Sequence, residues 1–114
     1  MRRAILATLS SLAAVSAITA IPTDAFSGAH TAASHTVTLK NIRFHPGTLA
    51  INRGDSVRWL WRDGRTEHNV TFPGFHSRTQ ASGSYTVRFT HRGSFSYHCT
   101  IHVREGMRGK IVVR

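Results

Sequence analysis

The chain has 114 residues with one cysteine, and its 15 basic and 5 acidic residues give a formal net charge of +10 at neutral pH. This length suits one domain, and a single cysteine excludes an intramolecular disulfide. A strongly basic chain favours acidic partners or anionic surfaces. We expect no nucleic-acid binding, because the sequence carries no binding motif and no basic-aromatic stripe.

The N-terminal segment has the pattern of an export signal. Arg2 and Arg3 precede an uncharged, apolar run over residues 4–21. Small residues offer four cleavage points, after Ala17, Ala20, Ala25 or Ala29. We therefore expect residues 1–25 to be a signal peptide and the mature protein to have no stable membrane anchor. An uncleaved anchor is the alternative, but the run is rich in Ala, Ser and Thr and is followed by Pro22.

The segment 26–34 is small and polar, with no periodicity, and we expect it to be a flexible N-terminus. Cleavage after Ala29 would make His30 the first residue, whose amine and ring could then bind Cu(II). That is one of four cleavage options. We assign no role to His35. The remaining chain, residues 35–114, is expected to form the folded domain.

From residue 35 onward the apolar residues alternate with polar ones in short runs. The seven runs cover residues 37–44, 49–51, 57–61, 68–72, 85–89, 95–99 and 110–113. Short strands with regular turn signals and no helical periodicity indicate an antiparallel β-sandwich or barrel. The first run changes phase after Leu39, so we expect a strand with a bulge near Asn41. Residues 73–84 are expected to form a loop.

Candidate metal ligands gather between residues 97 and 107. Cys99 is followed by His102 and then by Met107, and His68 lies upstream. Thiolate and thioether favour Cu(I), imidazole suits both copper oxidation states, and His₂Cys with a weak axial Met is the blue-copper arrangement. A buried cysteine is also common as a small core residue, but the polar residues after Cys99 favour a site.

Strand alternation places Cys99 on the core face with Phe95 and Tyr97, and His98 on the opposite face. Only one of the two adjacent residues can therefore be a ligand at an interior site. We hypothesise that His98 marks a second, lateral route for electrons through the strand.

At these residues the chain resembles the plastocyanin/amicyanin branch of the cupredoxins, the type 1 blue-copper family, from about Thr36 to Val113. The matching segments are 55–59, 68–70, 97–100, His102 and 107–110. The Cys-x2-His-x4-Met spacing is that of plastocyanins, whereas amicyanins have two fewer residues between His and Met. The resemblance implies a cupredoxin-like antiparallel Greek-key β-sandwich of about seven strands.

The resemblance also implies a role for each matching residue. His68, Cys99 and His102 would be the equatorial ligands of one copper ion, and Met107 its long axial ligand. Asn69 would tie the two ligand-bearing loops together by hydrogen bonding. His102 would be the ligand at the solvent edge, through which electrons pass.

Three positions depart from the family pattern, so the resemblance does not extend to the redox potential or the partner surface. Trp61 stands where the family usually has Asn, Glu67 where a Pro or an apolar residue precedes the first ligand, and Ile101 where Pro is common.

The function that follows is that of an exported one-electron carrier, periplasmic or extracellular and monomeric, which cycles between Cu(I) and Cu(II). Its expected partner is an acidic redox protein, such as a cytochrome or a copper or quinone enzyme. The alternative is a copper chaperone or copper-sequestering protein without a redox partner. Such sites are often rich in Met and His and open, and the chain has only two methionines, one of them Met1, which favours the carrier.

We expect no enzymatic activity. The short chain leaves little room for a substrate cleft, and no acidic residue obviously orients a histidine for nucleophilic catalysis. Its length also excludes a multicopper oxidase or a nitrite reductase, which need a second copper site or a second domain.

Overall fold

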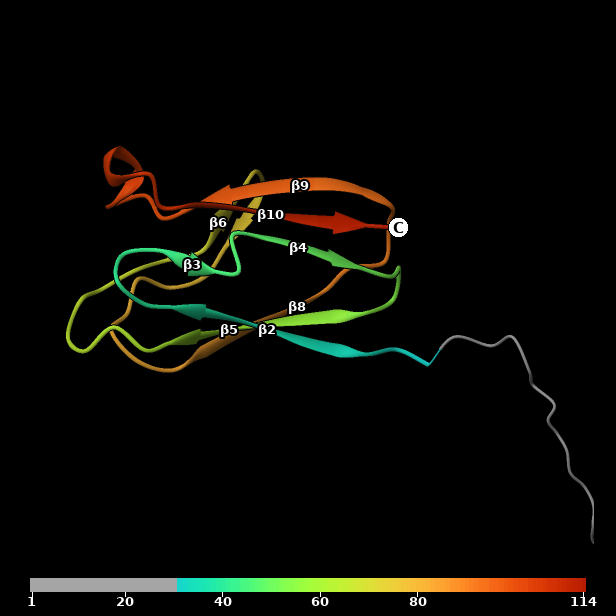
Figure 1. Cartoon of the computed structure of the whole chain (residues 1–114), viewed down its shortest axis with the longest axis horizontal. Helices are drawn as coiled ribbons and strands as arrows, with labels where there is room; N and C mark the ends of the chain where they lie inside the picture. Colours follow the sequence, from blue (N-terminus) through green and yellow to red (C-terminus); the bar gives the residue numbers. More distant parts are fainter. Residues whose placement is uncertain (1–30) are drawn as a thin grey trace, which may run out of the picture. The chain divides into compact units, whose positions relative to one another are not determined.

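The computed structural model describes residues 31–114 (Figure 1). The expected signal peptide over 1–25 and the first five residues of the expected flexible segment 26–34, which include His30, lie outside the described residues. Ser34, the last residue of that segment, already belongs to strand β2 (Ser34–Leu39). Between residues 31 and 114 no helix combines the length and the apolar character needed to cross a bilayer.

Two sheets face each other across an apolar core (Figure 1). The strands are β2 (Ser34–Leu39), β3 (Phe44–His45), β4 (Thr48–Ile51), β5 (Ser56–Trp61), β6 (Thr71–Phe72), β7 (Phe75–His76), β8 (Ser84–Arg88), β9 (Gly93–His98) and β10 (Arg108–Val113). One sheet has the order β4-β10-β9-β6-β7 and the other the order β3-β2-β5-β8. The predicted β-sandwich is therefore confirmed.

The sheets are mixed, because β2 pairs in parallel with β5, and β10 with β4. Alternation shows which face a residue occupies but not which strand lies beside it, so the sequence could not reveal these two pairs. The prediction of a loop over residues 73–84 is wrong in part, because β7 lies within this range and pairs with β6.

The bulge expected near Asn41 is also wrong, because the chain turns back there to start β3. Lys40 and Arg43 exchange two main-chain hydrogen bonds of 3.0 and 3.1 Å, and both Asn41 and Ile42 have a φ of 55°. Positive φ at both central residues is typical of the tight two-residue hairpin turn. A β-branched residue such as Ile42 rarely adopts it, which explains why the pattern suggested a bulge.

Inward-facing residues of the strands form one buried cluster. Its members are Val37, Leu39, Phe44, Ile51, Val57, Trp59, Trp61, Val70, Phe72, Phe89, Tyr97, Cys99, Met107, Ile111 and Val113. Each large side chain buried in this way contributes about 1.5–3 kcal/mol relative to an exposed one. Trp59 lies in the middle, with edge-on ring contacts to Phe72 and Tyr97. Cys99 belongs to this cluster, so core packing fixes the position of the thiol.

Candidate metal centre

His68 lies in the connection between β5 and β6, where its backbone is held from two sides. It forms an isolated antiparallel bridge with Gln80, with main-chain hydrogen bonds of 2.9 and 3.1 Å. The indole N–H of Trp61 donates to the His68 carbonyl at 2.9 Å. The His68 side chain is fully buried. Trp61, which replaces the usual Asn of the family pattern, therefore positions the first candidate ligand through its main chain.

Cys99 follows β9 directly, and a tight loop at the end of the sandwich where β9 ends leads from Cys99 into β10 (Figure 1). The Cys99 N–H donates to the Met107 carbonyl at 3.0 Å, and the Met107 N–H donates to the His102 carbonyl at 3.2 Å. A single 3₁₀ turn, Val103–Glu105, fills the loop and ends at Gly106, whose φ of 83° favours glycine. Met107 is fully buried, and the main-chain hydrogen bond from Cys99 holds the two residues side by side.

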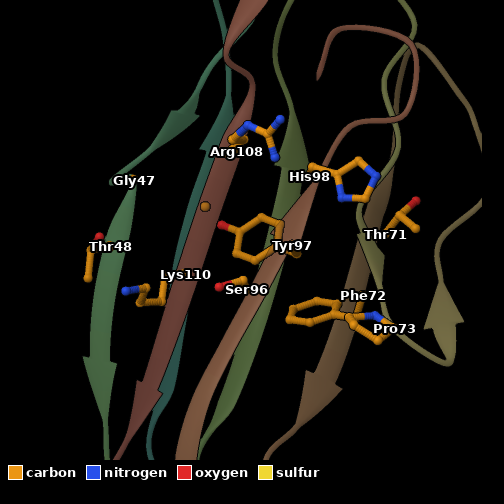
Figure 2. Close-up of a pocket in the computed structure, with 11 residues that line it drawn as sticks. Gly47, Thr48, Thr71, Phe72, Pro73, Ser96, Tyr97, His98, Arg108 and Lys110 are labelled. Atoms are coloured by element: carbon orange, nitrogen blue, oxygen red, sulfur yellow. The ribbon is translucent and has the colours of Figure 1, made fainter. Parts of the chain in front are cut away.

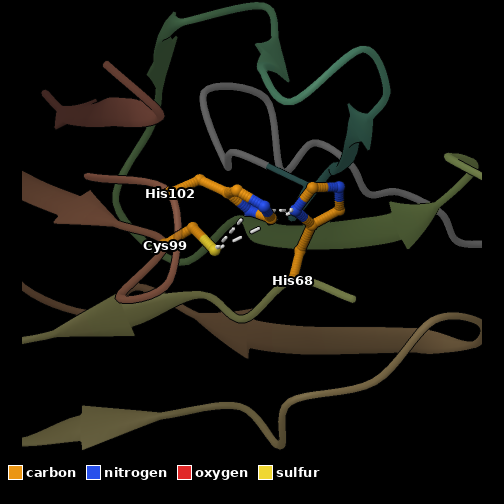
Figure 3. A group of neighbouring side chains, drawn as sticks. All are labelled: His68, Cys99 and His102. Atoms are coloured by element: carbon orange, nitrogen blue, oxygen red, sulfur yellow. Dashed lines mark hydrogen bonds between the residues drawn. The ribbon is translucent and has the colours of Figure 1, made fainter. Parts of the chain in front are cut away.

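The three strongest candidate ligands converge on one point. Figure 3 shows the His68 and His102 rings and the Cys99 thiol directed toward one another. The Nδ1 atoms of the two histidines lie 3.1 Å apart, and Cys99 Sγ lies 3.9 Å from His68 Nδ1 and 3.6 Å from His102 Nδ1. These are also the three residues of the described chain whose donor atoms all lie within 4.8 Å of one another.

These separations fit one ion shared by the three side chains. In zinc sites, metal–nitrogen bonds are about 2.0 Å and metal–sulfur bonds about 2.3 Å long. With bonds of these lengths in a trigonal arrangement, the two nitrogens would lie roughly 3.5 Å apart and the sulfur roughly 3.8 Å from each nitrogen. The observed atoms lie within a few tenths of an ångström of those positions. Two imidazoles and a thiolate in a trigonal set, with a thioether nearby in the fold, suit copper best.

Asp63 orients the His68 ring, and the sequence did not identify it. Asp63 Oδ2 lies 2.7 Å from His68 Nε2, the ring nitrogen that faces away from the cluster. If His68 held a metal through Nδ1, its proton would lie on Nε2, which would donate it to this carboxylate and so fix the ring. Partial burial acts to raise the pKa of Asp63, but hydrogen bonds from Ile42, His68 and Asn41 outweigh it and hold the pKa below its usual value.

The same carboxylate links the candidate site to the turn after β2. Its two oxygens accept the main-chain N–H groups of Asn41 and Ile42, each at 3.0 Å. The expectation that no acidic residue orients a histidine was wrong, because Asp63 contacts His68 and the buried Asp55 contacts His35 at 2.9 Å. The Asp63-Gly64 pair indicated only a turn, since strand periodicity carries no information about where a turn carboxylate points.

Asn69 connects the two segments that carry the candidate ligands. Its amide donates to the hydroxyls of Thr79 and Thr100 at 2.9 and 2.7 Å, and its carbonyl accepts the Thr100 N–H at 3.0 Å. The same carbonyl accepts the Thr71 hydroxyl at 2.9 Å. The Asn69 main-chain N–H points at Cys99 Sγ, at 3.5 Å. This nearly buried side chain therefore holds the His68 and Cys99 segments in register.

The cluster reaches solvent at one edge. His102 is half-buried, whereas His68 and Cys99 are fully buried. The neighbouring Ile101 side chain is 50% exposed, which makes it one of the two exposed large apolar residues within residues 31–114.

Comparisons with known proteins agree with this geometry. Residues 31–114 match the family described as copper binding proteins of the plastocyanin/azurin family. Amicyanin of Paracoccus denitrificans is 33% identical over 85 residues, which cover 68% of this chain and 63% of that protein. The plastocyanin of Tetradesmus obliquus is 33% identical over 85 residues, covering 62% of this chain and 58% of that protein. The chain thus spans less than two thirds of the length of these relatives.

Another relative is the copper-resistant cuproprotein CopI of Rubrivivax gelatinosus, 32% identical over 100 residues, covering 64% of this chain and 61% of that protein. Among solved structures, a Cu(I) form of an amicyanin mutant superposes with a TM-score of 0.64 at 29% identity, over 71% of this chain and 82% of the other.

Proposed function

The chain belongs to the plastocyanin/azurin family of copper-binding proteins, and on that premise we propose that it is an exported one-electron carrier with a single type 1 copper ion. His68, Cys99 and His102 are the proposed equatorial ligands, and Met107 is the proposed axial ligand. The observation that supports this most is the triangle of His68, Cys99 and His102 donor atoms, within 4.8 Å of one another and largely withdrawn from solvent.

When bound, copper supplies one-electron chemistry by cycling between Cu(I) and Cu(II). The chain's contribution is to keep the donor atoms in place between the two states. The bridge to Gln80 restrains His68, and the main-chain hydrogen bond to Met107 restrains Cys99. Cys99 binds as a thiolate, so loading releases a proton and affinity falls at low pH. The Asn69 N–H directed at Sγ tunes the basicity of that sulfur.

The half-buried edge of the site is the proposed route for the electron. His102 is the one equatorial candidate that is not fully buried, and exposed Ile101 beside it offers apolar contact to a partner. The proposed partner is an acidic redox protein, such as a cytochrome or a copper or quinone enzyme, met by a monomeric carrier in the periplasm or outside the cell. The proposed role is electron transport and not the turnover of a substrate.

A redox titration of the copper-loaded protein tests this function. A carrier is reduced and reoxidised reversibly by one electron per chain, and it keeps its copper in both states when a chelator is present. Loss of copper to the chelator after each reduction would contradict the carrier.

Copper handling without a redox partner is the second candidate. It is favoured by the relationship to the copper-resistant cuproprotein of Rubrivivax gelatinosus. The same four residues could hold copper for storage or delivery. The chelator experiment separates the two, since delivery requires that copper leave and transport requires that it stay.

A further inference from the structure

A second feature of the molecule lies on the outer face of the five-stranded sheet, away from the core. A hollow of about 720 Å³ opens between β4, β10, β9 and β6 (Figure 2). We call it the outer groove, and its polar lining is Thr48, Thr71, Ser96, His98, Arg108 and Lys110. Both residues of β6 and the following Pro73 form part of the wall of the groove.

Strand register places these side chains on one face. Arg108 pairs with His98, and His98 pairs with Thr71, so they form one row across three strands. Lys110 pairs with Ser96 on one side and with Thr48 on the other, which forms a second row. Directly paired residues in a sheet point to the same side. The two basic residues and His98 therefore lie together on the outer surface.

The outer groove has no carboxylate in its lining. Of the four acidic residues in the described part of the chain, Asp55 and Asp63 contact His35 and His68. The other two, Glu67 and Glu105, lie in the ligand-bearing segments. Arg108 and Lys110 are exposed, and neither forms an ion pair with a described residue. The groove is thus a site of uncompensated positive charge lined with hydroxyl groups.

We propose that the outer groove docks a projecting acidic segment of the redox protein that exchanges electrons with this chain. The inference rests on the proposed function and deepens it by locating a contact for the partner. Charge complementarity selects an acidic surface and speeds encounter. The hollow shape favours a projecting protein segment over a flat lipid surface. His98, which lines the groove, is covalently joined to Cys99, so a docked segment lies one residue from the proposed thiolate ligand.

A synthetic polyglutamate peptide serves as the probe. Amide chemical shifts of the Cu(I)-loaded protein and of the metal-free protein are followed in parallel during titration at low salt. We expect the largest shifts in β9, β10 and β6, and weaker binding at high salt. The double variant Arg108→Gln/Lys110→Gln should bind the peptide about tenfold more weakly, because two positive charges that would face its carboxylates are lost. The matched control, Arg43→Gln/Arg58→Gln, removes the same charge from exposed sites elsewhere and should change affinity less than about twofold.

Equal losses in the two double variants would overturn the proposal, because net charge alone would then explain binding. Shifts centred on Ile101 would overturn it as well, and so would binding to vesicles of phosphatidylglycerol without binding to the peptide. Failure of the proposed function is recognised separately. If the protein binds the peptide in the groove but forms no type 1 copper site, the docking proposal stands and the carrier function fails. If it forms the copper site but does not bind the peptide in the groove, only the docking proposal fails.

Discussion

Replacing Asp63 with alanine tests how a carboxylate outside the ligand set holds the candidate site together. Asp63 Oδ2 lies 2.7 Å from the fully buried His68 ring, and its oxygens accept two main-chain N–H groups, from Asn41 and Ile42, at 3.0 Å. The substitution leaves a buried imidazole nitrogen without its partner. It also removes both side-chain hydrogen bonds that hold the turn after β2.

The expected cost follows from these three contacts. A buried polar atom that loses its partner costs about 1–3 kcal/mol, and the two more exposed bonds contribute about 0.5–1 kcal/mol each. The free energy of unfolding should therefore fall by about 2–5 kcal/mol, out of a typical total of about 5–15 kcal/mol. For a domain of this size, such a loss lowers the Tm by at least about 10 °C. Copper affinity should fall by about tenfold to a hundredfold, as when other ligand-orienting partners are removed.

The assay is urea and thermal unfolding of the metal-free protein, together with copper competition against a chelator. Glu67→Gln is the matched control, because Glu67 is exposed, adjacent to His68 and also acidic. Asp63→Asn keeps one acceptor and should fall between the wild type and Asp63→Ala, which preserves the test if the alanine variant does not fold. Indistinguishable stability and copper affinity in Asp63→Ala and Glu67→Gln would refute the reasoning.

Three further outcomes are expected. Gly109→Ala places a Cβ against the Tyr97 ring and should lower the free energy of unfolding in urea by about 1–3 kcal/mol. The control Gly47→Ala, whose Cβ would have its nearest neighbour 3.9 Å away, should lower it little, and equal losses in the two variants would contradict this packing. Asn69→Ala removes four side-chain hydrogen bonds and should lower stability by about 2–4 kcal/mol, and exposed Asn52→Ala measured beside it should not. Burial raises the pKa of Tyr97 to about 12, although a contact with the Trp59 side chain acts to lower it. In the unfolded chain the pKa of tyrosine is about 10. The stability held by the neutral Tyr97 phenol is therefore complete below about pH 10 and is lost as the pH rises toward about 12. Unfolding curves of Tyr97→Phe should show a smaller loss, because burial raises only the pKa of the remaining Tyr85 phenol.

Much of the fold could be predicted from the sequence, because strand periodicity and turn residues are local signals. The candidate ligands Cys99, His102 and Met107 are also close in sequence, so their spacing alone indicated a site. His68 was a candidate by its residue type, but it lies 31 residues from Cys99 in sequence, and only the resemblance gave it the role of an equatorial ligand. The structure places its ring nitrogen Nδ1 3.9 Å from the Cys99 sulfur.

The features that sequence did not reveal depend on tertiary contacts. The left-handed conformation of Ile42 contradicts the preference of a β-branched residue, and the Asp63 carboxylate that accepts its N–H comes from another turn. The parallel pairing of β2 with β5 and the rows of the outer groove depend on strand order and register, which alternation does not encode. In the sequence Trp61 stood out only as a departure from the family pattern, yet its N–H donates to the His68 carbonyl.

The central claim is that His68, Cys99, His102 and Met107 hold one copper ion in a type 1 site. The most direct test is to load the purified protein with Cu(II) and record its visible absorption and EPR spectra. The account predicts an intense thiolate-to-copper absorption band and a narrow parallel hyperfine splitting, both lost in Cys99→Ser. A colourless protein with an ordinary tetragonal Cu(II) spectrum would contradict it and would favour a copper-handling role.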